Sequence, residues 1–248
     1  MNLSPQLTND YYRELSFSLD PYQILNWTIN RFSIDKITMG TGFGAPGIVL
    51  LDILHKINPN IDIFYIDPGY LFKETYRLKK RLEKYFNKKL IRFSTPISID
   101  EQSKKYGQNL WETDPNSCCN LRKVQPLYNA LIKKDVWITG IRKAQTIMRQ
   151  KSEIIEFDER FNVTKVNPLI NWTHAEVWDY IRKNSLPYNE LHDQGYPSLG
   201  CIQCTSTVNR NEDDREGRWR GISKTECGLH FITEDEKIKT NNFRDSHE

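Results

Sequence analysis

Short apolar runs alternate with longer amphipathic segments from residue 36 onward, and this alternation predicts an α/β fold. The short runs are interpreted as strands and cover 36–39, 61–66, 90–93 and 136–139. The longer segments show helical spacing of their apolar residues and cover 46–57, 72–86 and 124–133. Helices between successive strands favour right-handed crossovers, so we expect a mostly parallel, twisted sheet flanked by helices.

Other segments carry weaker versions of the same signals. Residues 1–33 are predicted to form a helical extension, because the apolar positions in its second half follow a helical stripe. Residues 153–166 indicate a strand pair or an extended segment. Residues 173–183 predict a helix that begins with a capping box formed by Thr173 and Glu176.

The last quarter of the chain has no regular period. Residues 186–228 are rich in proline, glycine, aspartate, arginine and cysteine, and residues 233–248 are polar. A long irregular segment inside a compact protein is usually functional or held by a metal, so we expect a site in the first stretch and a mobile tail in the second. Since no linker-like stretch divides the chain, we expect one domain over 1–248, with the parts 1–33, 36–185, 186–230 and 231–248.

Charge and hydropathy narrow the function classes. The 248-residue chain has a formal net charge of +3, too small an excess to indicate nucleic-acid binding but compatible with a small anionic substrate. It lacks an apolar stretch of the roughly 20 residues that cross a bilayer, and residues 1–12 lack the pattern of a signal peptide. We therefore expect a cytoplasmic protein with no membrane partner. The oligomeric state stays open, a homo-oligomer included.

Four of the five cysteines form two pairs, Cys118-Cys119 and the CxxC motif of Cys201 and Cys204. In a reducing compartment such thiols are more often metal ligands or nucleophiles than disulfides. A CxxC motif alone is compatible with a redox pair or with half of a zinc site. Adjacent cysteines suit a wider target than one zinc ion, and a cubane iron–sulfur cluster offers separate irons to four thiolates. Buried structural cysteines are the plain alternative, which the polar surroundings of both pairs disfavour.

The fifth cysteine, Cys227, stands near the C-terminus with a lysine and a histidine close by in the sequence. Neighbouring cations lower the pKa of a thiol and favour the nucleophilic thiolate. A surface cysteine without a role is also compatible with this pattern.

A strand, a glycine-rich turn and a helix surround Thr41, Gly42 and Gly44. Such a unit can present backbone N–H groups and a helix N-terminus to an anion. The signal is weak by itself, because a glycine-rich turn is more often only a tight turn.

Several motifs follow one another in one order along the chain. They are TGFGA at 41–45, GYLFKETY at 69–76, Cys118-Cys119 with Arg122-Lys123, TGIR at 139–142, LPYN at 186–189, HDQGYPS at 192–198, CIQC at 201–204 and KTECGLH at 224–230. Over residues 36–230 this combination resembles the sulfonucleotide reductases, and more narrowly the iron–sulfur assimilatory adenylyl-sulfate (APS) reductases. Family members that use the 3'-phosphorylated nucleotide (PAPS) keep the C-terminal cysteine but lack the paired ones. The resemblance implies the adenine nucleotide alpha hydrolase-like (PP-loop) fold, with an irregular cluster-binding and catalytic region over 186–230.

The resemblance also implies a reaction. Cys227 attacks the sulfur of APS and releases AMP, and an external dithiol, thioredoxin or glutaredoxin, then releases sulfite from the S-sulfocysteine for cysteine biosynthesis. The implied cofactor is one 4Fe-4S cluster bound by Cys118, Cys119, Cys201 and Cys204. The implied substrate-binding residues are Thr41, Gly42, Gly44, Ile66, Lys123, Gly140, Arg142, Arg149, Arg215, Arg218 and His230.

Two positions depart from the family's pattern. Gly42 stands where a serine is usual, and Pro68 stands where a threonine is usual, so each departure removes a hydroxyl. We therefore expect contacts to the nucleotide through Thr41, main-chain N–H groups and the backbone of Ile66 instead.

Other interpretations stay open. The chain is also compatible with a PAPS reductase or a dual APS/PAPS reductase. An ATP pyrophosphatase-type enzyme would share the fold, but the chain lacks the SGGxDS loop of that class. A non-catalytic binding module stabilised by zinc is the remaining alternative.

Overall fold

The computed structural model describes residues 20–230, and at its centre lies a six-stranded sheet in the order β3-β2-β1-β4-β6-β5. The strands are β1 (Ile37–Gly40), β2 (Asp62–Ile66), β3 (Ile91–Phe93), β4 (Val136–Ile138), β5 (Ile155–Asp158) and β6 (Val163–Val166). Neighbouring strands are parallel except for the edge pair β5–β6, which is antiparallel. The predicted mostly parallel sheet is confirmed, and residues 153–166 form the strand pair.

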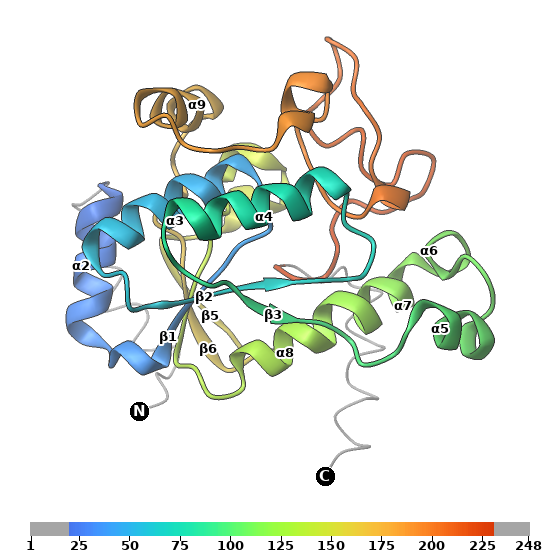
Figure 1. Cartoon of the computed structure of the whole chain (residues 1–248), viewed down its shortest axis with the longest axis horizontal. Helices are drawn as coiled ribbons and strands as arrows, with labels where there is room; N and C mark the ends of the chain where they lie inside the picture. Colours follow the sequence, from blue (N-terminus) through green and yellow to red (C-terminus); the bar gives the residue numbers. More distant parts are fainter. Residues whose placement is uncertain (1–19, 231–248) are drawn as a thin grey trace.

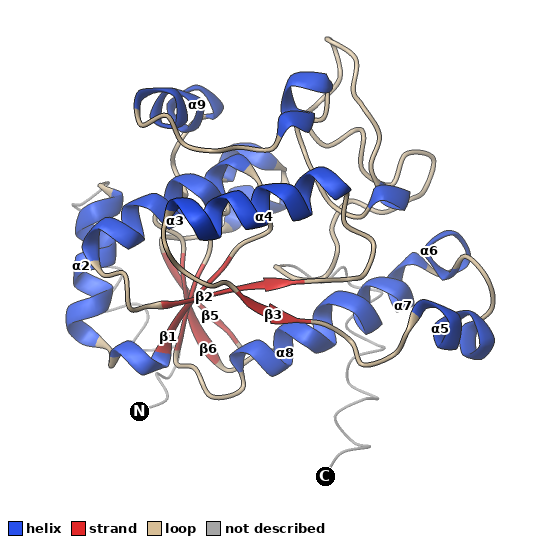
Figure 2. Ribbon diagram, viewed as in Figure 1, coloured by secondary structure: helices blue, strands red, loops and turns tan. Residues whose placement is uncertain are grey.

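Helices cover both faces of the sheet, as Figures 1 and 2 show. Helices α3 (Ala45–Ile57) and α4 (Lys73–Tyr85) lie on one face, and α8 (Gln125–Leu131) lies on the other. The larger apolar cluster also takes in α2 (Pro21–Arg31) and α9 (His174–Lys183). The smaller cluster, under α8, includes Leu127, Leu131, Phe64 and Trp137. Two apolar clusters on opposite faces explain why the strands read as short apolar runs.

The predicted helices begin where local chemistry favours it. In α2, Asp20 accepts a hydrogen bond from the N–H of Tyr22 at 2.8 Å, and a proline follows the cap. In α9, the N–H of Glu176 donates to Thr173 Oγ1 at 3.2 Å, and the Thr173 N–H donates to the Glu176 carboxylate at 2.7 Å. The predicted capping box is therefore confirmed. The predicted helical extension 1–33 is tested only from residue 20 onward, since residues 1–19 lie outside the described part.

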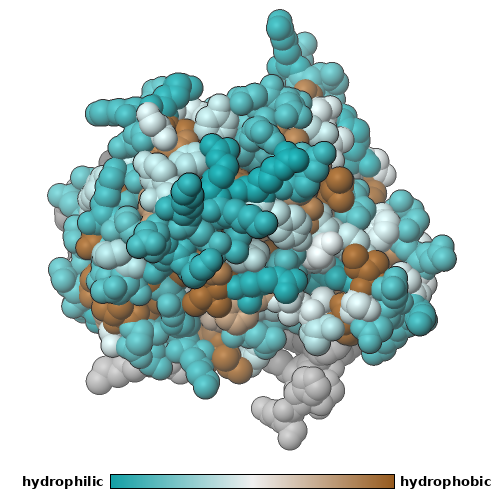
Figure 3. All heavy atoms as spheres, viewed as in Figure 1, coloured by the Kyte–Doolittle hydropathy of each residue, from teal (hydrophilic) through white to brown (hydrophobic). Residues whose placement is uncertain are grey.

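Helix α4 shows the amphipathic pattern most clearly. Thr75, Leu78 and Leu82 are buried against the sheet, and the remaining positions are largely charged. On the face of the molecule drawn in Figure 3, hydrophilic residues dominate and hydrophobic ones form small separate groups. Burial of the stripe of Thr75, Leu78 and Leu82 accounts for the position of α4 against the sheet.

Three short helices before α8 were not predicted from the sequence pattern. They are α5 (Ile99–Tyr106), α6 (Leu110–Thr113) and α7 (Pro115–Cys119), and the wide π-helical turn η2 (Asn120–Val124) joins α7 to α8. Asp114 caps α7 by accepting from the Ser117 N–H at 3.0 Å. Helices of one or two turns carry too few residues to show a clear period, so only the last of this series, predicted over 124–133, was visible as a pattern.

Residues 186–230 lie mostly in loops, drawn in orange and red in Figure 1. Their only regular helical turns are η5 (Glu190–Gln194) and η6 (Ile202–Cys204), and short bridges pair Leu71 with Cys201 and Thr205 with Arg218. Three further short turns elsewhere are η1 (Ile34–Lys36), η3 (Lys143–Gln145) and η4 (Met148–Lys151). The predicted polar tail 231–248 lies outside the described residues. Within residues 20–230, no helix combines the length and apolar character needed to cross a membrane.

Candidate active site

A cavity of about 270 Å³ opens at the carboxyl ends of β1, β2 and β4, between the sheet and the segment 186–230. Ligands of open α/β sheets bind at this edge, where loops and helix N-termini converge. Its lining includes the predicted nucleophile and every predicted substrate-binding residue: Thr41, Gly42, Gly44, Ile66, Lys123, Gly140, Arg142, Arg149, Arg215, Arg218, Cys227 and His230.

The turn between β1 and α3 forms one wall of this cavity. Thr41 Oγ1 accepts a hydrogen bond from the Phe43 N–H at 3.2 Å, and Gly44 is the residue that caps α3. Gly140 packs so closely on this turn that an added Cβ would lie 3.2 Å from the backbone nitrogen of Gly47. A Cβ on Gly42 would meet nothing within 4 Å. The serine that is usual in the family would therefore fit here, and lack of space does not explain why this chain has glycine and no hydroxyl. The helix N-terminus and the turn amides together form an anion-binding arrangement.

Asp67, at the tip of β2, organises the next turn rather than facing the cavity. It accepts hydrogen bonds from the Gly69 N–H at 2.9 Å, the Tyr76 hydroxyl at 2.7 Å and Arg92 Nε at 2.7 Å. Burial raises the pKa of Asp67, but these hydrogen bonds outweigh burial and leave the pKa below its usual value. The turn therefore holds Pro68 in place, and Pro68 lines both this cavity and a second, smaller one.

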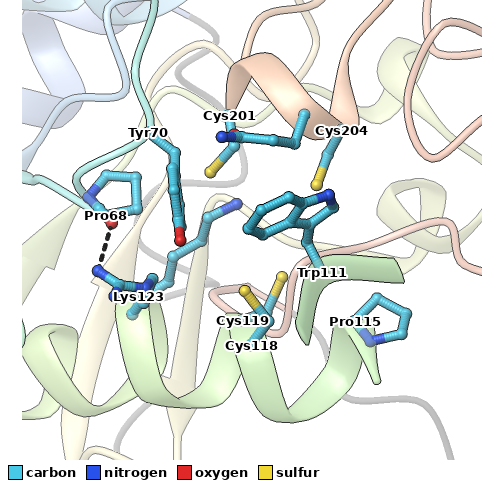
Figure 4. Close-up of a pocket in the computed structure, with 11 residues that line it drawn as sticks. Pro68, Tyr70, Trp111, Pro115, Cys118, Cys119, Lys123, Cys201 and Cys204 are labelled. Carbon is cyan, nitrogen blue, oxygen red and sulfur yellow. Dashed lines mark hydrogen bonds between the residues drawn. The ribbon is translucent and has the colours of Figure 1, made fainter. Parts of the chain in front are cut away.

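The four paired cysteines line this second cavity (Figure 4). Cys118 and Cys119 end α7 just before the π-helical turn, Cys201 caps η6 and Cys204 is its last residue. Figure 4 shows the sulfurs of the adjacent pair on the same side, facing those of the CxxC pair. A helical backbone thus brings adjacent side chains to a common space, which an extended backbone would not do.

The four cysteines of this cavity form no disulfide. Burial and neighbouring thiols raise the pKa of Cys118 to about 12, and burial raises the pKa of Cys204 to about 11. Within residues 20–230, no three His, Cys, Asp or Glu side chains are grouped like the ligands of a single metal ion. The four sulfurs instead surround a shared space.

Lys123 connects the two cavities, since it lines both. The side chain comes from η2 and is buried, and its ammonium lies 6.0 Å from the ring centre of Trp219. Burial lowers the pKa of Lys123, but the neighbouring thiols of Cys201, Cys119 and Cys227 outweigh burial and raise it above its usual value. Lys123 is therefore a buried cation between the paired cysteines and Cys227.

Four arginines bring positive charge to the larger cavity, namely Arg142, Arg149, Arg215 and Arg218. Glu226 is their main counter-ion: it is 2% exposed and bonds Arg149 through two contacts of 3.0 Å and Arg215 through one of 3.2 Å. Burial raises the pKa of Glu226, but the two guanidinium groups outweigh burial and lower it. Among the described residues, the Nε atoms of Arg142 and Arg215 are buried without a hydrogen-bond partner. Unpartnered buried donors and excess positive charge suit an anionic ligand.

The segment that carries Cys227 is folded into the cavity. Gly228 has φ +78°, and Leu229 packs on the smaller apolar cluster. The His230 ring stacks on Trp137, with ring centres 5.0 Å apart and planes inclined by 10°. Burial raises the pKa of Cys227, but Lys123 and the Leu229 N–H help to lower it, and the net pKa is below the usual value. Burial, followed by nearby cations, holds the pKa of His230 well below its usual value, so the imidazole is neutral.

Several lining residues were missed by sequence reasoning. Trp137 was interpreted as part of a core strand, yet its indole N–H lacks a partner among the described residues. His174 contacts Asp214 at 3.3 Å, and both line the cavity although they are 40 residues apart in sequence. Glu226 stands next to Cys227, so its position in the motif was the one available signal.

Comparisons with known proteins agree with this geometry. Residues 36–207 match the phosphoadenosine phosphosulfate reductase domain family. Adenosine 5'-phosphosulfate reductase of Salinibacter ruber is 46% identical over 217 residues, which cover 87% of this chain and 86% of the relative. The enzyme of the same name from Lysinibacillus sphaericus is 43% identical over 209 residues, covering 84% of this chain and 89% of the relative.

Solved structures show the same relationship. Phosphoadenylyl-sulfate (PAPS) reductase from Candida auris, in a phosphate complex, has a TM-score of 0.73 and 33% identity, covering 84% of this chain and 99% of that chain. Candida glabrata FMN adenylyltransferase, at 17% identity and a TM-score of 0.56, covers 90% of this chain and 78% of that chain and shares the fold alone. The predicted PP-loop fold is thereby confirmed. With a family match over most of its length, a cysteine-bearing segment folded into the cavity and relatives above 40% identity, this chain belongs to the phosphoadenosine phosphosulfate reductase domain family.

Proposed function

We propose that this chain is an adenylyl-sulfate reductase that converts APS to sulfite and AMP in assimilatory sulfate reduction, upstream of cysteine biosynthesis. One observation carries the proposal: Cys227 lies in the same cavity as the turn at Thr41 and the arginine cluster. A soft nucleophile, an anion-binding turn and guanidinium groups are what a reaction at a phosphosulfate needs. The names of the relatives support APS as the substrate.

Different groups of lining residues would contact different parts of such a nucleotide. Thr41, Gly42 and Gly44 would bind the α-phosphate at the N-terminus of α3, with Ile66 and Gly140 beside the nucleoside. Arg142, Arg149, Arg215 and Arg218 would neutralise the phosphosulfate, because guanidinium groups donate paired hydrogen bonds to tetrahedral anions. Lys123 and His230 would lie beside the sulfate end of the nucleotide, near Cys227. In this assignment, residues 36–185 supply most of the nucleotide site and two of the proposed cluster ligands, and residues 186–230 supply the other two ligands, two arginines and the catalytic cysteine.

The four paired thiols fit a 4Fe-4S cluster better than a single zinc ion. They line one cavity, and a cubane cluster offers a separate iron to each of four thiolates, whereas one zinc ion needs all its ligands within about 2.3 Å. We propose Cys118, Cys119, Cys201 and Cys204 as its ligands. When bound, the cluster supplies a cross-link between two distant segments and an electrostatic field beside Lys123.

Cys227 would carry the sulfur between the two steps of the reaction, and an external dithiol would supply the electrons. The Cys227 thiolate attacks the sulfur of APS, a sulfur–sulfur bond forms, and the electron pair of the broken sulfur–oxygen bond leaves with AMP. Arginines around the phosphate hold the charge of this leaving group. A thiolate of an external dithiol then attacks Cys227 Sγ and expels sulfite with its electron pair. The second thiol of that dithiol attacks the mixed disulfide, which returns Cys227 to the thiol and leaves the partner oxidised.

Thioredoxin or glutaredoxin is the proposed partner for these last steps, because the described chain offers no second thiol beside Cys227 outside the proposed ligands. Five free cysteines suit a reducing compartment, so we propose the cytoplasm as the location. No role in nucleic-acid binding follows from the cavity or from the charge.

Turnover of APS and PAPS by the same preparation, with thioredoxin as reductant, tests this proposal. We expect sulfite from APS, with kcat/KM at least about tenfold above that for PAPS, which is about 1.4 kcal/mol of differential transition-state binding. Equal or reversed preference would assign the chain to PAPS or dual reduction instead. Absence of sulfite from either nucleotide, with zinc bound in place of iron, would favour the non-catalytic module.

A further inference from the structure

The hairpin of β5 and β6 contacts the catalytic segment although it takes no part in the cavity wall. Arg160, in the turn of this hairpin, donates from Nη1 to the Gly228 carbonyl at 2.7 Å and from Nη2 to the Leu229 carbonyl at 3.1 Å. It is absent from the residues that line the cavity. Arg160 therefore contacts the chain that follows the nucleophile and not the place where substrate would bind.

Arg160 is itself held in one orientation. Its Nε donates to Asp158 Oδ1 at 2.9 Å and its Nη2 to Asp158 Oδ2 at 2.7 Å. The guanidinium also lies over the Phe161 ring, 4.8 Å from its centre. Asp158 is 7% exposed and Arg160 22%, so both partners are largely withdrawn from water. A paired, stacked guanidinium loses little freedom when it binds a further acceptor, and a charged donor makes a stronger hydrogen bond.

The peptide group that Arg160 binds lies one residue after the nucleophile. The Gly228 carbonyl and the Leu229 N–H belong to the same peptide unit, and the Leu229 N–H is one of the groups that lower the pKa of Cys227. A donor on the carbonyl side polarises the peptide and strengthens the bond that its N–H makes. A continuous series of hydrogen bonds thus runs from Asp158 through Arg160 to the peptide that follows Gly228, one residue after Cys227.

The residue whose carbonyl Arg160 binds has an unusual backbone conformation. Gly228 adopts a left-handed φ of +78°, and an added Cβ would lie 3.2 Å from Val124 Cγ2. Residues with a side chain rarely adopt this conformation, so glycine is favoured at this position. Leu229 and His230 add apolar contact and ring stacking, but neither of these sets the direction of a peptide group.

We propose that Arg160, oriented by Asp158, is a positioning residue that holds the Gly228–Leu229 peptide with its N–H directed at the Cys227 sulfur. This rests on the proposed function for the role of Cys227 as nucleophile. Arg160 acts through the peptide and contacts no substrate. Its loss therefore lowers the rate of sulfur transfer and leaves the affinity for APS nearly unchanged.

The test compares full-length wild-type protein with Arg160→Ala, Arg160→Lys and Arg182→Ala. Arg182 pairs with Asp179 on the exposed surface of α9, so its loss controls for removal of an arginine–carboxylate pair. The first measurement is hydrogen–deuterium exchange of the amides of residues 227–230 without substrate. We expect the Leu229 amide to exchange at least about tenfold faster in Arg160→Ala, the loss of one charge-assisted hydrogen bond, and at the wild-type rate in Arg182→Ala.

The second measurement is the rate at which saturating APS, without thioredoxin, adds a sulfonate to Cys227, followed by mass. Arg160→Ala is expected to slow this transfer by about tenfold or more, with the apparent KM within about threefold of wild type. Arg160→Lys recovers at least about a third of the lost rate, because an ammonium can still donate to one carbonyl.

Wild-type exchange in Arg160→Ala, a loss confined to KM, or a lysine variant no better than alanine would each overturn the proposal. If Arg160→Ala lowers the midpoint of thermal unfolding of the whole chain, Arg160→Gln is used in place of the alanine variant. Glutamine keeps part of the aliphatic side chain and an amide donor but carries no charge. If wild-type protein gains no sulfonate, the proposed function fails, and the exchange contrast still decides the positioning role.

Discussion

The sheet core and the segment 186–230 both bury their central groups, but different forces hold them. Around α3, Ile48, Val49 and Leu50 are fully buried among other apolar side chains. In the irregular segment, the buried groups include Trp219 and Glu226, each 2% exposed. Around them, guanidinium groups stack on the indole, with Arg218 at 4.5 Å from the ring centre, and pair with the carboxylate.

The two kinds of contact respond differently to change. Apolar contact is non-directional and depends on area and packing, so a core loses stability in proportion to the volume removed. Buried charge contacts depend on both partners being present, and removal of one partner leaves the other charged and unpaired. The segment that carries Cys227 also packs through Leu229 and His230, but its contacts through Glu226 are ones that a competing anion or a change of pH would weaken. Such weakening would let the same thiol face APS and then an external dithiol.

The largest expected effect separates chemistry from the stability of either region. Cys227→Ser should reduce sulfite formation by on the order of 10³-fold or more, because a hydroxyl is a far weaker nucleophile than a thiolate at neutral pH. The free energy of unfolding should stay within about 0.5 kcal/mol of wild type. Sulfite release and urea denaturation measure the two quantities. An active serine variant, or a sulfonate found on another cysteine after incubation with APS, would contradict the assignment.

Next in size is a change in the core. Leu50→Ala should lower the free energy of unfolding by about 2–5 kcal/mol, because it removes a fully buried side chain from a packed cluster. Ile222→Ala, at a position 37% exposed in the irregular segment, should change it by less than about 0.5 kcal/mol. Equal losses in urea denaturation would show that apolar packing holds both regions and would remove the contrast between them.

Loss of a proposed cluster ligand should affect the irregular segment more than the sheet. Protein purified without oxygen should contain about four irons per chain if one cubane cluster is bound. Cys204→Ala should lose that iron and speed amide exchange in residues 201–230, with a smaller effect on β1 and β4. Cys227→Ser is the matched control, since it removes a thiol but should retain the iron. Stoichiometric zinc without iron would contradict the assignment of a 4Fe-4S cluster.

The smallest effect is a dependence on pH. Glu226 has a pKa below its usual value when paired with Arg149 and Arg215, so docking of the segment is favoured above the ordinary glutamate pKa of about 4.3. As the pH falls below that value toward the docked pKa, protonation should weaken docking by up to about tenfold per pH unit. Amide exchange of residues 225–230, corrected for intrinsic rates, measures this. Glu226→Gln should show no such dependence, and a parallel slope in the glutamine variant would assign the effect to another group.

The arrangement of the strands was only partly visible in the sequence. Apolar runs located the strands at β1, β2, β3 and β4 within a residue or two. For β1, β2 and β4 the reason is burial on both faces of the sheet, which leaves a continuous local signal, whereas the edge strand β3 is mostly exposed. Their order, with β1 between β2 and β4, depends on pairing between distant segments and has no local signature. The helices α5, α6 and α7 were missed for the reason already given, their shortness.

The sequence by itself determined the family, the α/β class, the nucleophile candidate Cys227 and the two cysteine pairs, because these rest on residue identity and short spacing. Only the tertiary structure brought the pairs to one cavity, through the helical backbone at Cys118 and Cys119. Tertiary structure also decided that Glu226 neutralises the arginines and that Arg160 contacts the peptide after Gly228. Those contacts join residues 68 to 77 positions apart. No local pattern encodes them, because their energy exists only once the chain has folded and excluded water from the charged groups.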